Sequence, residues 1–136
     1  MENKKIFLDT NIVVDMIDAK REHHKDSILL LKMFIIEGYE VFISEDMLST
    51  LYFISKDKKA TLEFFENIIY VDWNIMSYGQ KVISEATNIS LIKGIDLEDT
   101  LQCLCAKNNG CNLLITNDKK FVNCGIEIVN YERFLK

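Results

Sequence analysis

The chain has 136 residues, a length that suits one domain with a hydrophobic core of its own. Hydrophobic residues make up 49% and charged residues 27%, ordinary proportions for a globular protein. The formal net charge of −5 argues against a tight sequence-reading DNA-binding protein, because such proteins neutralise phosphates with basic side chains. No apolar run reaches the ~18 residues needed to cross a membrane. We therefore expect a cytoplasmic protein without a membrane partner.

Four cysteines are present, and none forms a pair with the C-x-x-C spacing of zinc and redox sites. They are Cys103, Cys105, Cys111 and Cys124. A cytoplasmic setting also favours reduced thiols. We predict four free cysteines.

The chain opens with a short apolar strand at residues 4–9, which ends at a polar turn. Residues 12–17 predict a helical turn, and residues 18–25 are a charged stretch. Apolar residues then recur at helical spacing over residues 26–37, where Gly38 can end the helix. This segment predicts a strand followed by helices.

Residues 39–43 are rich in β-forming side chains and predict a second strand. Ser44 is suited to begin a helix that runs to Ile54. After a charged break at residues 56–59, a short helix is expected over residues 60–67. The apolar run at residues 68–71 predicts a third strand.

The second half of the chain continues the alternation of helices and strands. A helix is predicted over residues 77–92 and a second helix, capped by Asp96, over residues 97–108. Strands are predicted at residues 112–115 and 126–129, and a final helical turn at residues 131–135.

Five short strands that alternate with helices are typical of a parallel sheet in an α/β fold. We therefore predict a single domain over residues 1–136, with a five-stranded parallel sheet flanked by helices on both faces.

Acidic side chains follow the ends of three predicted strands and open one predicted helix. They are Asp9, Glu45, Asp46, Asp96, Glu98, Asp99 and Asp118. Ligands of open parallel sheets bind beyond the carboxyl ends of the strands, so these acids should share one edge of the sheet.

Each acid has a plain structural explanation when it is taken alone, as a helix cap, a turn residue or a partner of a helix dipole. Taken together, crowded carboxylates repel each other unless a cation binds between them. Oxygen ligands without histidine or cysteine favour Mg²⁺ or Mn²⁺. Such ions suit phosphoryl chemistry.

Three segments, in this order and at this spacing, resemble the PIN-domain family, which includes the VapC-type toxins of bacterial toxin–antitoxin pairs. They are Phe7-Leu8-Asp9-Thr10-Asn11-Ile12, Asp96-Leu97-Glu98-Asp99-Thr100-Leu101-Gln102 and Leu114-Ile115-Thr116-Asn117-Asp118-Lys119-Lys120-Phe121. The resemblance extends over essentially the whole chain.

The resemblance implies a set of site residues. Asp9, Asp99 and Asp118 would be the catalytic acids and would bind the metal. Thr10, Asn11 and Thr116 would orient them through hydrogen bonds.

One position departs from the family pattern, which usually has a glutamate before a Leu-Tyr-like pair in the helix after the second strand. Aligned on Leu51 and Tyr52, this position holds Thr50. Asp46 lies one helical turn earlier on the same face and can serve as a fourth metal ligand. Its neighbour Glu45, or Glu98 in the later helix, are alternatives.

The function implied by the resemblance is a Mg²⁺- or Mn²⁺-dependent endoribonuclease that hydrolyses RNA phosphodiester bonds. Such a protein would be a toxin with an antitoxin partner, and a homodimer is also open. The alternative is a PIN-fold binding module that has lost catalysis and acts through protein or RNA contacts. A phosphotransfer protein with Asp9 as acceptor is disfavoured, because the haloacid-dehalogenase-like pattern needs Asp-x-Asp and position 11 is Asn.

Overall fold

Five strands form one sheet in the computed structural model, which describes residues 4–136. They are β1 (Lys5–Leu8), β2 (Glu40–Ser44), β3 (Asn74–Met76), β4 (Leu113–Ile115) and β5 (Glu127–Val129). All pairings are parallel, and the order across the sheet is β3-β2-β1-β4-β5. The predicted five-stranded parallel sheet with flanking helices is confirmed.

The central strand β1 pairs with β2 on one side and with β4 on the other. The chain moves outward from β1 to β2 and β3, and then returns to the opposite side of β1 as β4. The strand order therefore reverses between β1 and β4. In open parallel sheets the crevice at such a reversal is where ligands bind.

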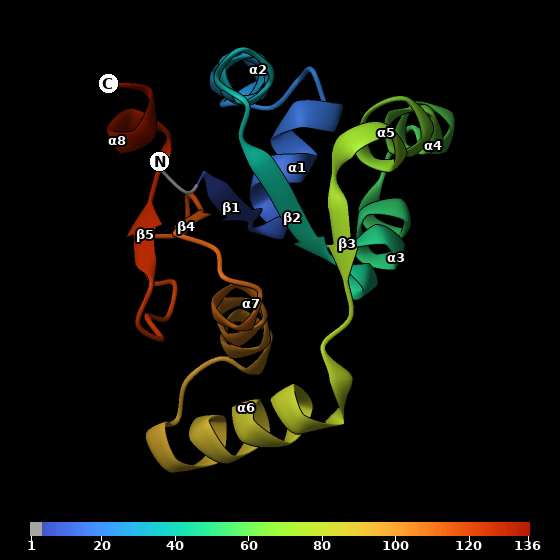
Figure 1. The fold of residues 1–136 in the computed structure, drawn as a ribbon. Helices are drawn as coiled ribbons and strands as arrows, with labels where there is room; N and C mark the ends of the chain where they lie inside the picture. The colour runs from blue at the N-terminus through green and yellow to red at the C-terminus, as the bar shows by residue number, and fades with distance from the viewer. Residues whose placement is uncertain (1–3) are drawn as a thin grey trace.

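Helices cover both faces of the sheet, as Figure 1 shows. In that view α1 (Thr10–Ile17) and α2 (His24–Glu37) lie above the sheet, while α7 (Leu97–Asn108) and α6 (Gly79–Lys93) lie below it. The last helix, α8 (Tyr131–Leu135), packs against α2. Because both faces are covered, Ile6, Phe7 and Leu8 of β1 are completely buried.

A third group of helices lies beside the edge strand β3: α3 (Glu45–Ile54), α4 (Lys58–Phe64) and α5 (Tyr70–Asp72). A single π-helical turn, η1 (Phe65–Ile69), joins α4 to α5. Helix α4 begins within the predicted break at residues 56–59, because the Asp57 carboxylate accepts a hydrogen bond from the Ala60 amide at 3.0 Å.

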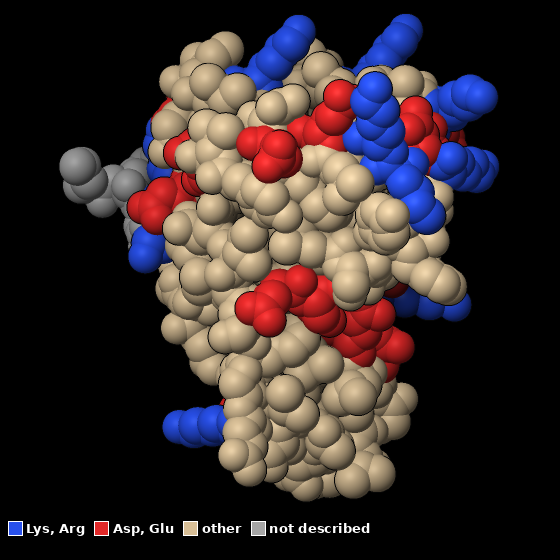
Figure 2. Space-filling view, turned by 90° about the vertical axis from the view of Figure 1, so that its right-hand side faces the viewer, with Lys and Arg blue, Asp and Glu red and all other residues tan. Residues whose placement is uncertain are grey.

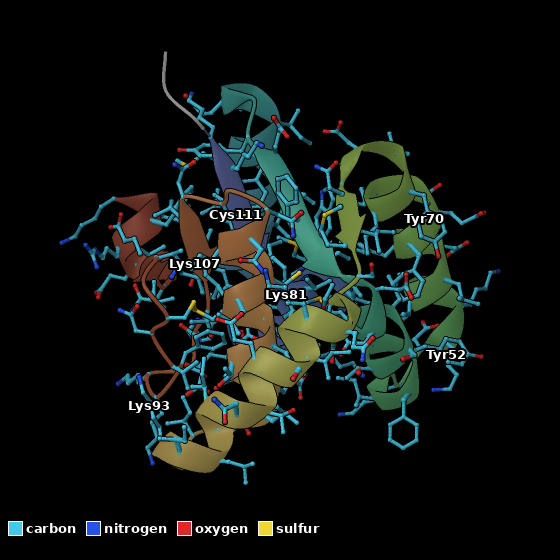
Figure 3. All side chains as sticks on the ribbon, turned by 60° about the horizontal axis from the view of Figure 1, so that its bottom comes forward. Tyr52, Tyr70, Lys81, Lys93, Lys107 and Cys111 are labelled. Carbon is cyan, nitrogen blue, oxygen red and sulfur yellow. A yellow bond between two sulfur atoms is a disulfide. The ribbon has the colours of Figure 1, made fainter. Side chains whose placement is uncertain are left out.

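The strand predicted at residues 68–71 is wrong. This apolar run continues the helical segment, because Phe65 and Ile69 lie four residues apart and both point into the core. The third strand lies later, at Asn74–Met76, where it pairs with β2. Side chains on the outer surface of this helical group are exposed, and Figure 3 shows Tyr52 and Tyr70 there.

A buried carboxylate connects α1 to its neighbours. Asp15 is 3% exposed, and its two oxygens accept hydrogen bonds from Arg21 Nε at 2.9 Å and from the Tyr131 hydroxyl at 2.7 Å. Its backbone oxygen lies 2.7 Å from Nδ1 of His24. Asp15 thus joins α1 to the start of α2 and to α8, and each oxygen of its buried carboxylate accepts a hydrogen bond.

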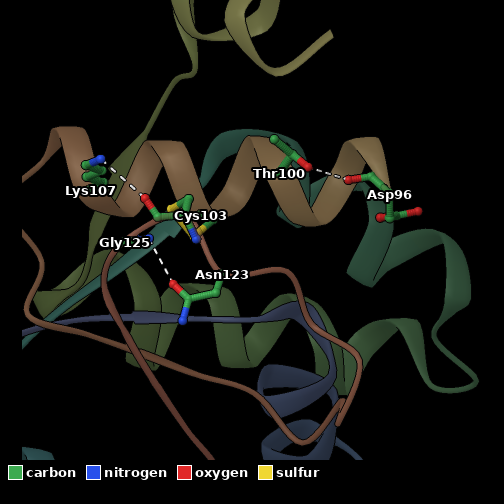
Figure 4. Close-up of a disulfide and its surroundings, with 7 residues drawn as sticks. Asp96, Thr100, Cys103, Lys107, Asn123 and Gly125 are labelled. Atoms are coloured by element: carbon green, nitrogen blue, oxygen red, sulfur yellow. Dashed lines mark hydrogen bonds between the residues drawn. A yellow bond between two sulfur atoms is a disulfide. The ribbon is translucent and has the colours of Figure 1, made fainter. Parts of the chain in front are cut away.

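The prediction of four free cysteines is wrong for two of them. Cys103 in α7 and Cys124 in the β4–β5 loop form a disulfide, shown in Figure 4, while Cys105 and Cys111 are buried thiols. The two bonded residues are 21 positions apart, so local spacing could not reveal the pair. Within residues 4–136, no helix is both long and apolar enough to cross a membrane.

Candidate active site

Asp9 follows β1 at the point where the strand order reverses, and it is only 7% exposed. It is the N-cap of α1, because its Oδ1 accepts a hydrogen bond from the Thr10 amide at 2.7 Å. Its Oδ2 accepts from the Thr116 hydroxyl at 2.7 Å and from Asn11 Nδ2 at 3.2 Å. The Asp9 side chain therefore both caps α1 and lies in the crevice.

Burial raises the pKa of Asp9 above its ordinary value, and the negative charge of Asp118 raises it further. The hydrogen bonds from Thr116 and Thr10 act in the opposite direction, because they stabilise the carboxylate. These hydrogen bonds therefore partly offset the cost of burying the charged carboxylate.

Thr116 connects two acids at the end of β4. Its hydroxyl donates to Asp9 and accepts from the backbone amide of Asp118 at 3.0 Å. Thr116 is only 2% exposed, so both hydrogen bonds of its hydroxyl are shielded from water. The Asp118 carboxylate itself is exposed and accepts a hydrogen bond from the Lys120 amide at 2.9 Å.

The first turn of α7 brings a second pair of acids to the same crevice. Burial raises the pKa of Asp99 to about 7, and the charges of Asp96, Asp9, Asp118 and Glu98 contribute. The pKa of Glu98 is also raised, first by burial and then by Asp46, Asp9 and Asp96. These mutual effects show that acids from distant parts of the chain lie near one another.

Asp96 is also the N-cap of α7, since its Oδ2 accepts a hydrogen bond from the Asp99 amide at 2.9 Å. The two acids of the first turn, Glu98 and Asp99, also lie at the positive end of α7, which stabilises negative side chains.

Thr50 lies in α3, one helical turn after Asp46. Thr50 lines a shallow surface depression with Ser49, Phe53 and Lys58, and its hydroxyl donates to the Asp46 carbonyl at 3.3 Å. Asp46 is the acid of α3 whose charge acts on Glu98, and Glu45 is exposed beside it. Of the alternatives to the missing glutamate, Asp46 and Glu98 therefore lie nearest the crevice.

Gln102 belongs to the same site, although its side chain was given no role from the sequence. It is 1% exposed, and its Nε2 donates to the Thr10 hydroxyl at 3.3 Å. Its Oε1 has no hydrogen-bond partner among the described residues. The sequence contained a sign of this role, because Gln102 follows Glu98 by one helical turn and so lies on the same face of α7.

A second pair without an assigned role is Ser44 and Tyr78, whose buried hydroxyls have no hydrogen-bond partner of good geometry within residues 4–136. Ser44 occupies the N-cap position before α3, but its side chain makes no capping hydrogen bond, contrary to expectation. Burial raises the pKa of Tyr78, and the nearby charge of Asp46 raises it further. Both hydroxyls therefore lie beside Asp46 at the end of β2.

The chemistry of these side chains fits a hard divalent cation, because the donors are carboxylate, hydroxyl and amide oxygens. No three histidine, cysteine or acidic side chains in the described part of the chain are already arranged around one point as a metal site. Carboxylates that lie near one another repel, and a bound cation would offset this repulsion. Figure 2 shows Asp and Glu side chains in a band across one face, with lysines and arginines above it.

Neutralising Asp99 is expected to stabilise the cation-free protein. Because its folded pKa of about 7 lies above its ordinary value of 3.8, its contribution to stability is lost as pH rises through that range. Asp99→Asn should therefore gain about 1–2 kcal/mol at about pH 8, a value discounted for partial exposure, and almost nothing near pH 4. Thermal unfolding in a chelator measures this, with exposed Asp72→Asn as control; an equal gain at both pH values contradicts it.

Comparison with known proteins identifies the family of this chain. The sequence model described as "PIN domain" matches residues 6–126. Ribonuclease VapC1 from Aquifex aeolicus (strain VF5) is 34% identical over 140 residues, which cover 98% of this chain and 95% of that protein.

Solved structures share the fold at lower identity. VapC20 from Mycobacterium tuberculosis, a sarcin-ricin loop cleaving toxin, has a TM-score of 0.69 and 14% identity, over 85% of this chain and 92% of that chain. A toxin-antitoxin complex from Klebsiella pneumoniae has a TM-score of 0.68 and 16% identity, over 93% and 97% of the two chains. At these identities the two structures establish the fold alone. The resemblance drawn from the sequence motifs is confirmed.

Proposed function

Because the chain belongs to the PIN domain family, we propose that it is an endoribonuclease that hydrolyses RNA phosphodiester bonds with Mg²⁺ or Mn²⁺. The observation that carries this proposal is the gathering of Asp9, Asp99 and Asp118 at the crevice between β1 and β4. The likeness to Ribonuclease VapC1 supports RNA as the substrate.

The side chains have distinct tasks in this proposal. Asp9, Asp99 and Asp118 would hold the cation, and Asp46 and Glu98 would complete the acidic set where Thr50 replaces the family glutamate. Thr116 fixes Asp9 relative to the backbone of Asp118. A bound Mg²⁺ or Mn²⁺ would activate a water and stabilise charge on the scissile phosphate.

Thr10 and Asn11 also hold the Asp9 carboxylate. The Thr10 amide and Asn11 Nδ2 donate to opposite oxygens of Asp9, so its carboxylate plane is fixed before any ligand arrives. Asn11 Oδ1 lies 3.5 Å from the Asn117 amide, which links the β1 and β4 turns. Such preorganisation is what an electrostatic site needs.

The test is cleavage of a single-stranded RNA by the purified chain, with Mn²⁺ or with a chelator. We expect cuts only with Mn²⁺, and products with 5′-phosphate and 3′-hydroxyl ends. Products ending in 2′,3′-cyclic phosphate, or cleavage that persists in the chelator, would refute metal-dependent hydrolysis.

A PIN-fold binding module without catalysis is the second candidate. It is favoured by Thr50 at the glutamate position and by the lack of a preassembled cation site among residues 4–136. RNA binding without cleavage at any Mn²⁺ concentration would support this candidate.

We further infer that the chain is a toxin with an antitoxin partner. The relative Ribonuclease VapC1 and the fold shared with a toxin-antitoxin complex support this inference. Exposed apolar side chains on α3, such as Phe53 at 83% exposure, supply surface for a partner or a second copy. Expression alone should arrest growth, and co-expression with a neighbouring small reading frame should restore it. Unchanged growth on expression alone would count against a toxin.

A further inference from the structure

A cavity of about 890 Å³ opens beside the candidate active site. It lies between the β4–β5 loop and α8, and the segment from Thr116 to Asp118 lines it. The same segment belongs to the acidic crevice. A strand of RNA with one phosphate beside Asp118 would therefore have its next nucleotide at the mouth of this cavity.

Two asparagines give the cavity a defined hydrogen-bonding character. Oδ1 of Asn123 accepts from the Gly125 amide at 2.9 Å, and Oδ1 of Asn130 accepts from the Arg133 amide at 2.9 Å. Each amide orientation is thereby set. The two NH₂ groups donate to none of the described residues, so they are available to a ligand.

Other lining groups favour a nucleotide. Lys119 supplies a positive charge, and the partly buried ring of Phe121 supplies an aromatic surface. Single-stranded RNA is recognised by stacking on aromatic rings and by hydrogen bonds to base edges. The acids Asp26, Asp118 and Glu132 outnumber the basic residues Lys119 and Arg133 in the lining, so the cavity has no net positive charge that would favour a free phosphate.

Both walls of the cavity are held in place by contacts outside it. The loop that carries Asn123 is tied to α7 by the Cys103–Cys124 disulfide and by Lys107 Nζ, which donates to the Cys124 carbonyl at 3.2 Å (Figure 4). On the opposite wall, the Tyr131 hydroxyl donates to buried Asp15. Walls that are already ordered reduce the entropy lost on binding.

We propose that this cavity binds one unpaired base of the RNA next to the phosphate that is cut, and that Asn123 and Asn130 read its acceptor atoms. The base must present carbonyl oxygens or ring nitrogens to the two NH₂ groups. The cavity thus sets the sequence preference of cleavage. This inference rests on the proposed ribonuclease function for its cleavage readout, but not for its binding readout.

The test replaces each asparagine by aspartate, as Asn123→Asp and Asn130→Asp. Aspartate keeps the oxygen that accepts from Gly125 or Arg133 and caps α8 equally well, so the fold is retained. It replaces the donor by a charged acceptor. Asn88→Asp, on the exposed surface of α6, is the control for the added charge.

The readouts are the affinity for a fluorescent pool of single-stranded hexaribonucleotides in a chelator, and the cleavage positions in a randomised RNA with Mn²⁺. Each cavity variant should bind about tenfold more weakly than wild type and should change the base preferred beside the cut. Asn88→Asp should match wild type within about twofold.

The outcomes separate the two proposals. If wild type cuts RNA and both cavity variants keep its affinity and its cleavage positions, the cavity inference is overturned while the ribonuclease stands. If wild type does not cut but Asn123→Asp weakens RNA binding, the ribonuclease fails and the cavity remains an RNA site. A wild-type chain that neither binds nor cuts RNA overturns both.

Discussion

Asp9→Asn should lose RNA cleavage by at least about a hundredfold. The substitution removes the negative charge from the most deeply buried acid of the crevice, on which cation binding would depend. An asparagine can still accept from the Thr10 amide through Oδ1 and interact with Thr116 through its amide group. The fold should therefore survive while the activity is lost.

Initial cleavage rates with Mn²⁺ measure this effect, together with Asp118→Asn at the end of β4. Asp72→Asn removes an equal charge from the exposed surface of α5 and should retain wild-type activity. Circular dichroism verifies that all three variants are folded. Equal rates for wild type, Asp9→Asn and Asp118→Asn would dispose of the proposed catalytic role.

Asp15→Ala should have the largest effect on stability, a loss of about 2–3 kcal/mol in the free energy of unfolding. The Asp15 carboxylate is 3% exposed and is the partner of both Arg21 and the Tyr131 hydroxyl. Its removal leaves a cation and a buried hydroxyl without their acceptor. It also loosens α8, which forms one wall of the cavity beside Asp118.

Urea unfolding followed by circular dichroism measures the loss. Asp15→Asn should be less harmful than Asp15→Ala, because its amide oxygen can still accept one of the two hydrogen bonds. Asp72→Ala, on the surface, should change the free energy of unfolding by less than about 0.5 kcal/mol. A loss below about 1 kcal/mol for Asp15→Ala contradicts the assigned role of the network.

The inner strands could be predicted from sequence because they are short apolar runs that end at polar residues, as Leu8 does before Asp9. The third strand could not be. Residues 68–71 have the composition of a strand, but the burial of Phe65 and Ile69 four residues apart makes the segment helical. Tertiary packing outweighed local propensity there.

The positions of the acids followed from a general rule for parallel sheets, which places the ends of β1 and β4 at one crevice. The roles of their neighbours could be inferred only in part. Gln102 stands three residues after Asp99 and could have been recognised from helical spacing. The contacts of Ser44 and Tyr78 depend on how α6 packs on α7, which no local pattern reports.

The disulfide could not be predicted from the sequence for a related reason. Cys103 faces Cys124 only because the β4–β5 loop folds back along α7. The electrostatic effect of Asp46 on the pKa of Glu98 likewise links α3 to α7. In both cases the interaction joins segments far apart in the chain.

The central claim is that carboxylates from separate segments share a divalent cation, and calorimetric titration of the metal-free chain with Mn²⁺ tests it most directly. Wild type and Asp72→Asn should bind Mn²⁺ with equal affinity, while Asp9→Asn should bind at least about tenfold more weakly. Wild type that shows no heat of binding at millimolar Mn²⁺, or Asp9→Asn that binds as tightly as wild type, would contradict the account.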